Sequence, residues 1–122
     1  MNFAHMIKIS TYRAMIRRGL TNERMRAKNF SGADFSGLDF SGAVFDDADF
    51  TGADFSDASF EKTRFWCASF VNTDFSCSVF SRAKLRDIDL WMTDFTCTDF
   101  RDMKTEGIEF YHGAILDGET TL

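Results

Sequence analysis

The sequence predicts an all-β solenoid in which the chain turns a corner every five residues. Large apolar side chains recur at a strict spacing of five from Phe30 to Phe100, a period that matches neither an α-helix nor a single β-strand. A small residue stands two positions before most of them, and the 122 residues contain no proline. A fixed short period indicates units that bury their faces by stacking, and the absence of proline suits short uninterrupted strands.

The repeating large residues form the predicted core. We expect them to point inward, because the small residue of each unit lies close to the wall and leaves them room. Coils stacked at the strand spacing of ~4.8 Å would place each large side chain over the one a coil below. After Phe30, the predicted core residues are Phe35, Phe40, Phe45, Phe50, Phe55, Phe60, Phe65, Phe70, Phe75, Phe80, Leu85, Leu90, Phe95 and Phe100.

The net charge of −5 divides between two segments of opposite sign. Residues 1–28 hold seven Lys/Arg against Glu23 alone, whereas residues 29–122 hold seven Lys/Arg against eighteen Asp/Glu. We therefore predict a basic N-terminal helical cap segment over 1–28, a β-helical body over 29–116 and a tail over 117–122. No run of about 18 apolar residues exists, so we expect no membrane partner.

The N-terminal segment is interpreted as one helix that ends near Gly19. Ile9, Tyr12, Ile16 and Leu20 would share one side of it. We favour a cap, because the open end of a stacked coil exposes strand edges and needs covering. Its Arg-rich, acid-poor composition also fits a transit peptide or a nucleic-acid-binding arm.

Little in the sequence favours catalysis, so we predict no enzyme and no cofactor. His5 and His112 lie at opposite ends of the chain, outside any recognisable pairing of nucleophile and base. Aspartates that recur along the repeat could hold Ca²⁺, but a flat row supplies too few oxygens, and aspartate has a structural role in corner turns. The odd number of cysteines, at no zinc-like spacing, fits a reducing compartment.

Residues 29–104 resemble the pentapeptide-repeat family, on units such as "ADFSG", "ADFTG" and "ADFSD". The resemblance implies a right-handed quadrilateral β-helix with four pentapeptides per coil, about four coils in all. Leu38, Ile88 and Met103 depart from the small residue of the family pattern. Thr105 ends the strict register of large residues, Phe110 returns to it, and "AIL" at 114–116 reads as a repeat shifted by one.

The charges support four sides per coil. With four repeats per coil, all seven Lys/Arg of the body fall on the third and fourth sides. The first and second sides carry eight acids and no base. The second side includes the column Asp34, Asp54, Asp74 and Asp94. On the same side, Cys77 and Cys97 lie one coil apart, which favours a stack of small side chains over a redox pair.

Two hypotheses of partner binding follow. "FSRAKLRDIDL" and "TDFRDMKTEGIEF" resemble the quinolone-resistance (Qnr-type) branch of the family over residues 80–110, which implies an acidic, DNA-mimicking rod that binds DNA gyrase or topoisomerase IV. The candidate contacts are then Asp34, Asp54, Asp74 and Asp94, with no direct binding of nucleic acid. The alternative is an interaction or targeting module, such as a bacterial effector domain, that uses an aromatic patch of Trp91 and Tyr111 in a column with Val71.

A structural scaffold without a single partner is the third possibility. We expect a bacterial, cytoplasmic protein, with delivery as an effector as the alternative location. The oligomeric state is left open by the sequence.

Overall fold

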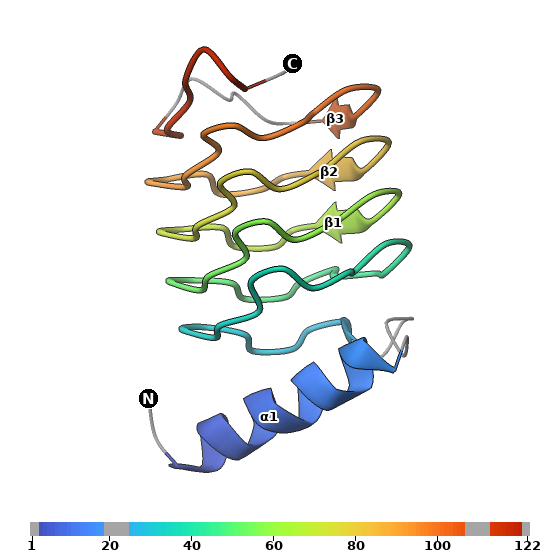
Figure 1. Cartoon of the computed structure of the whole chain (residues 1–122), viewed down its shortest axis with the longest axis vertical. Helices are drawn as coiled ribbons and strands as arrows, with labels where there is room; N and C mark the ends of the chain where they lie inside the picture. Colours follow the sequence, from blue (N-terminus) through green and yellow to red (C-terminus); the bar gives the residue numbers. More distant parts are fainter. Residues whose placement is uncertain (1–2, 19–24, 107–112, 121–122) are drawn as a thin grey trace.

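The computed structural model describes residues 3–18, 25–106 and 113–120. Helix α1 (Phe3–Arg17) is followed by three short strands, β1 (Arg64–Trp66), β2 (Lys84–Arg86) and β3 (Lys104–Glu106). Figure 1 shows a stack of flat coils with α1 lying across its N-terminal end. The helix predicted to end near Gly19 therefore ends at Arg17.

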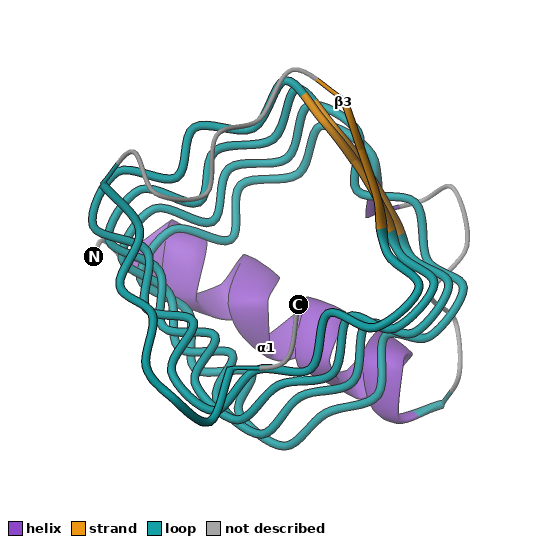
Figure 2. Cartoon of the chain, turned by 90° about the horizontal axis from the view of Figure 1, so that it is seen from above, coloured by secondary structure: helices purple, strands orange, loops and turns teal. Residues whose placement is uncertain are grey.

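Each coil takes twenty residues and pairs in parallel with the next. On one side Asn29 pairs with Asp49, Asp49 with Ser69 and Ser69 with Asp89. The same spacing joins β1 to β2, where Phe65 lies beside Leu85, and β2 to β3, where Leu85 lies beside Thr105. Seen from above in Figure 2, the successive coils nearly superimpose. Twenty residues per coil is the length that four pentapeptides require.

Extended strands are few because the corners interrupt them. Among the described residues only the side containing β1, β2 and β3 forms a three-stranded sheet, and the other sides pair through isolated bridges. At a typical corner the carbonyl of Phe30 accepts a hydrogen bond from the N–H of Ala33 at 3.0 Å. The residue before that N–H has positive φ: Gly32 at 68° in the first coil, and Asn72 at 54° at a later corner. The five-residue period is thus a short extended segment plus a tight turn.

The core is a column of stacked aromatic rings. Phe75 and Phe95, one coil apart, have ring centroids separated by 5.7 Å and planes only 11° apart. Within a coil the rings meet edge to face, as Phe75 and Phe80 do at 5.1 Å and 78°. Offset and edge-to-face contacts are the favourable geometries for aromatic pairs. All fourteen residues from Phe35 to Phe100 that the sequence places in the core are buried.

Threonine can replace alanine at the small position because its hydroxyl finds a partner. Thr73 donates to the carbonyl of Phe50 at 2.6 Å, and Thr93 donates to that of Phe70 at 2.7 Å. Of the bulkier departures, Ile88 is buried, while Leu38 and Met103 are half-buried against the core. Thus the wall accommodates larger residues at these three positions without losing the coil.

The C-terminal part of the described chain rejoins the stack with a one-residue offset. Asp94 pairs with Ile115, twenty-one residues later, and Leu116 packs against the core. This confirms the shifted repeat predicted at 114–116. Phe110 lies outside the described residues, and Thr105 still pairs in register with Leu85 although its side chain is exposed. Thr120 also contacts the last coil, since its hydroxyl donates to the carbonyl of Phe95 at 2.8 Å.

Helix α1 packs on the first coil. Ile9 and Ile16 are buried, and the Tyr12 ring meets Phe30 edge-on with centroids 5.3 Å apart. His5 forms a hydrogen bond with the carbonyl of Ser31 at 2.9 Å. Leu20, expected on the same side of the helix, lies outside the described residues.

Candidate functional site

Four aspartates stand one above another on the second side of the coil. Asp34 pairs in parallel with Asp54, Asp54 with Asp74, and Asp74 with Asp94. Each is the residue before an inward phenylalanine, so its side chain lies on the outer face of the wall. Asp34 is exposed and the other three are half-buried. We call these four residues the acidic column.

The local turn holds each carboxylate of the acidic column. The N–H two residues later donates to Oδ1, at 2.9 Å from Ser56 to Asp54 and at the same distance from Ser76 to Asp74. The serine hydroxyls donate to the same oxygens, at 2.7 Å for Asp54 and 2.6 Å for Asp74. In the part of the chain that the structure describes, the hydrogen bonds to the column all reach Oδ1. The second oxygen of each carboxylate is therefore left for solvent or a partner.

These bonds also favour the charged form where the column is most exposed. The hydroxyl and the N–H of Ser36 hydrogen-bond the Asp34 carboxylate and lower the pKa of Asp34 below its ordinary value. Arg13 of α1 adds a smaller effect in the same direction. Asp34, the first residue of the acidic column, is thus ionised at neutral pH.

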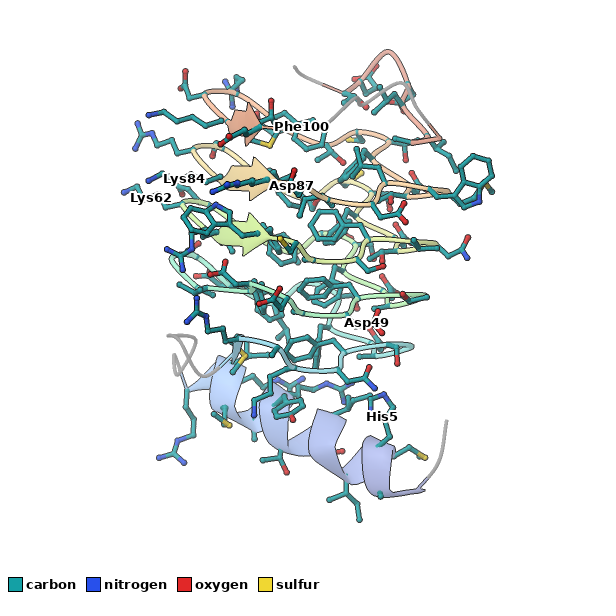
Figure 3. The ribbon with its side chains drawn as sticks, turned by 180° about the vertical axis from the view of Figure 1, so that it is seen from behind. His5, Asp49, Lys62, Lys84, Asp87 and Phe100 are labelled. Carbon is teal, nitrogen blue, oxygen red and sulfur yellow. The ribbon has the colours of Figure 1, made fainter. Side chains whose placement is uncertain are left out.

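Positive charge gathers on another side of the coil. Arg64, Lys84 and Lys104 are in register on β1, β2 and β3. Figure 3 shows Lys62 and Lys84 beside the strands, with Asp49 well away from them. The bases therefore lie on sides that also carry acids such as Asp46 and Asp87, away from the acidic column, as the four-sided interpretation predicts.

The aromatic patch is only partly within the described residues. The side chain of Trp91 is 57% exposed and that of Met92 47%, while Val71 in the coil below is half-buried. Trp91 lies against Gly113, where an added Cβ would meet Cε3 of the indole at 2.6 Å. Tyr111 lies outside the described residues. At this corner the structure thus shows one exposed tryptophan, Trp91, which packs against Gly113.

Sequence reasoning missed a buried ion pair. Asp46 is only 3% exposed and accepts hydrogen bonds from both Arg64 and Arg26. The one signal was the doublet Asp46–Asp47, since no other repeat within residues 29–104 has Asp directly after the large residue. Trp66 was missed too: the Arg64 guanidinium lies 4.2 Å from its ring centroid and that of Arg86 5.4 Å, both within cation–π range.

Neither a metal centre nor a membrane helix emerges from the described ranges. Over residues 3–18, 25–106 and 113–120, no three His, Cys, Asp or Glu side chains gather as metal ligands. The one helix among those residues is too short and polar to cross a membrane. His5 serves the contact between α1 and Ser31, while His112 lies outside the described residues.

Comparison with known proteins identifies the repeat. The family model for pentapeptide repeats matches in eight copies, over residues 29–66, 53–91 and 73–104. No curated protein matches the sequence.

Several solved structures resemble the chain. A pentapeptide repeat protein of the Arabidopsis thaliana thylakoid lumen is 24% identical, with a TM-score of 0.49, and covers 85% of this chain. Another from Nostoc Pcc 7120 is 20% identical, with a TM-score of 0.41, over 88% of this chain and 94% of its own. Trypsin-treated QnrB1, a plasmid-mediated fluoroquinolone resistance protein, is 19% identical, with a TM-score of 0.40, over 74% of this chain and 58% of its own. The alignment spans 61% of the Arabidopsis protein's length.

Proposed function

Because the chain belongs to the pentapeptide-repeat family, we propose that it is a protein-binding module without catalytic activity, whose acidic column docks into the DNA-binding surface of a type II topoisomerase. DNA gyrase is the preferred partner and topoisomerase IV the related one. The chain would bind the protein and not nucleic acid. The module is bacterial and cytoplasmic in this proposal, a right-handed quadrilateral β-helix capped by α1.

The arrangement of the acidic column is the observation that supports this proposal. Its carboxylates repeat once per coil, at ~4.8 Å, on a rigid wall. The body as a whole carries about one net negative charge per ~2.3 Å of its axis at that coil spacing. B-DNA carries one per ~1.7 Å. A basic groove built for DNA would therefore meet a comparable charge density, presented by oxygens that need not reorganise.

The test is binding of purified DNA gyrase by a variant with Asn at Asp54, Asp74 and Asp94. Asn keeps the Oδ1 acceptor that the turn needs, so the coil should persist while three charges are lost. We expect weaker binding and a flatter dependence of the dissociation constant on salt, measured by surface-immobilised binding at low and high ionic strength.

A charge-matched control variant distinguishes the effect of where the negative charges lie from the effect of the total net charge. Glu61→Gln, Asp87→Asn and Asp102→Asn remove the same number of charges from the third and fourth sides of the coil, which carry both acids and bases. This control should bind gyrase nearly as the wild type does. Equal weakening in both variants would reject a specific acidic face, and folded wild-type protein that binds neither topoisomerase would remove the mimicry proposal altogether.

The exposure of Trp91 supports a second candidate, an interaction or targeting module. A tryptophan that is 57% exposed beside Met92 is a residue type enriched at binding hot spots. In this alternative Trp91→Ala abolishes binding to the partner and the triple Asn variant binds normally. A scaffold with no single partner predicts that neither variant changes what the protein retains from a bacterial lysate.

A further inference from the structure

Two cysteines are stacked on neighbouring coils at one corner of the body. Cys77 and Cys97 are twenty residues apart, one full coil, and both are exposed. Their backbones match, with φ of 54° and 58°, and Asp74 pairs in register with Asp94 just before them. The N–H of Cys77 donates to the carbonyl of Thr96 at 2.8 Å, which ties the two corners together. The side chains therefore leave equivalent points of adjacent coils.

This spacing suits a covalent bond between the two sulfurs. Disulfide-linked residues usually have Cα atoms about 4.4–6.8 Å apart, and adjacent coils repeat at ~4.8 Å. The thiols already interact, since a hydrogen bond to Cys97 is the main cause that raises the pKa of Cys77 to about 11. Asp57 and Asp117, on either side of the pair, raise it further. Cys77 therefore holds its proton while Cys97 is its immediate neighbour.

We propose that Cys77 and Cys97 form a reversible dithiol–disulfide site that cross-links the two coils carrying Asp74 and Asp94. The oxidant is a small-molecule disulfide of the glutathione type. The thiolate of one of the two cysteines attacks one sulfur of the oxidant, breaks its S–S bond and releases one thiol. The other cysteine then attacks the sulfur of the first in the mixed disulfide and releases the second thiol. One protein disulfide forms, the oxidant gains two electrons, and the two cysteine protons end on the released thiols.

Either cysteine can make the first attack, because both side chains are exposed. In the mixed disulfide the target of the second cysteine is the adjacent sulfur one coil away, so proximity favours closure of the bond.

Cys67 provides an internal control. It is exposed and occupies an equivalent corner with φ of 59°, but the residues one coil away are Asp47 and Asp87. Cys67 thus has the same backbone and exposure without a thiol in the stacked position. Reactivity that depends on stacking must distinguish Cys67 from the other two.

The test treats the full chain with oxidised glutathione and follows it by intact mass, peptide mapping and thiol titration. We expect a 77–97 linked peptide, no glutathione on either of those two residues, and full reversal by dithiothreitol; any glutathione adduct should lie on Cys67. Cys67→Ser should form the same bond. Cys77→Ser and Cys97→Ser should form none, and the remaining partner should instead retain a glutathione adduct.

The thermal shift provides a second readout. The bond closes a loop of about twenty residues, so the oxidised wild type should unfold about 5–10 °C above its reduced form. Cys67→Ser should show the same rise, whereas neither Cys77→Ser nor Cys97→Ser should show it. Glutathione adducts at all three cysteines of the wild type, or covalent dimers in place of the internal bond, would overturn the proposal.

Discussion

Asp46 and Arg64, one coil apart, form a two-point ion pair on the wall of the body. Nε of Arg64 donates to Oδ1 of Asp46 at 3.1 Å, and Nη2 donates to Oδ2 of the same carboxylate. Arg26, just ahead of the first coil, donates to Oδ2 at 3.0 Å. The N–H of Trp66 also donates to Oδ1, at 3.3 Å. One buried carboxylate therefore joins the N-terminal segment to two successive coils.

Removing the charge of Asp46 should destabilise the fold. Asp46→Asn leaves Arg64 and Arg26 with a neutral acceptor, and we expect a loss of about 1–3 kcal/mol in the free energy of unfolding, since both arginines retain solvent contact. Urea unfolding at neutral pH measures it. Asp47→Asn is the control, because Asp47 is exposed and Asn tolerates its φ of 60°. Equal stability of the two variants would contradict the role given to Asp46.

The same pair predicts how stability depends on pH. Burial opposes ionisation of Asp46, but hydrogen bonds from Arg64 and Arg26 outweigh it and lower the pKa below its ordinary value of 3.8. A carboxylate with a depressed pKa contributes stability above pH 3.8 and loses it as the pH falls through the folded-state pKa. The difference between wild type and Asp46→Asn should therefore be full at pH 6 and shrink below pH 3.8. A difference that stays constant into acid would contradict this account.

The stacked core predicts that one ring in mid-body is indispensable. Phe75 is fully buried, with Phe55 and Phe95 stacked on its two sides. Phe75→Ala should cost about 3–5 kcal/mol, a large part of the stability of a domain of this size. Thermal unfolding followed by circular dichroism tests it. Met92→Ala, an exposed side chain, should change the stability by less than about 0.5 kcal/mol.

Helix α1 should protect the open end of the first coil. Glu at both Ile9 and Ile16 places charge in the buried face of the helix, which should detach it and expose the strand edges. We expect aggregation, measured by light scattering during size-exclusion chromatography. Glu at both Met6 and Ile7 adds the same charge to the exposed face and should leave a monodisperse protein. If the Ile9/Ile16 variant kept the wild-type size and unfolding midpoint, α1 would be an arm or an address signal instead of a cap.

The left-handed backbone conformation of the corners should affect stability even where an added side chain would meet no neighbouring atom. Gly42 has φ of 76°, and an added Cβ would meet no atom within 4 Å. Gly42→Val should still cost about 1–2 kcal/mol, because a β-branched residue is strained in the left-handed region. Gly42→Asn should cost less, since Asn tolerates that region. Equal urea midpoints for the two variants would contradict the strain argument.

Much of the fold could be predicted from sequence, because in a strict repeat the residue numbers alone indicate which residues stack on neighbouring coils. Once the period is five and the coil takes four units, residue 75 must lie over 55 and under 95. The burial of Phe75 and the stacking of the acidic column follow from that register. The family match over residues 29–104 confirms the resemblance inferred from the same pattern.

The acidic column shows which features of the site the sequence could not predict. Its alignment on one side could be predicted, but the engagement of Oδ1 by each turn could not, because it depends on where the N–H two residues later points. Tyr111, a candidate contact, falls outside the described residues, so the extent of the aromatic patch remains a prediction.

The sequence by itself therefore determined the period, the core and the confinement of the bases to two sides of the coil, since each depends only on residue type at a repeating position. Only the tertiary structure decided what happens where a unit departs from the pattern. Asp46 is buried because Arg26 and Arg64 reach it from other coils, and the guanidinium groups of Arg64 and Arg86 lie over the ring of Trp66. Such contacts depend on the directions of individual side chains across coils, which a periodic pattern does not encode.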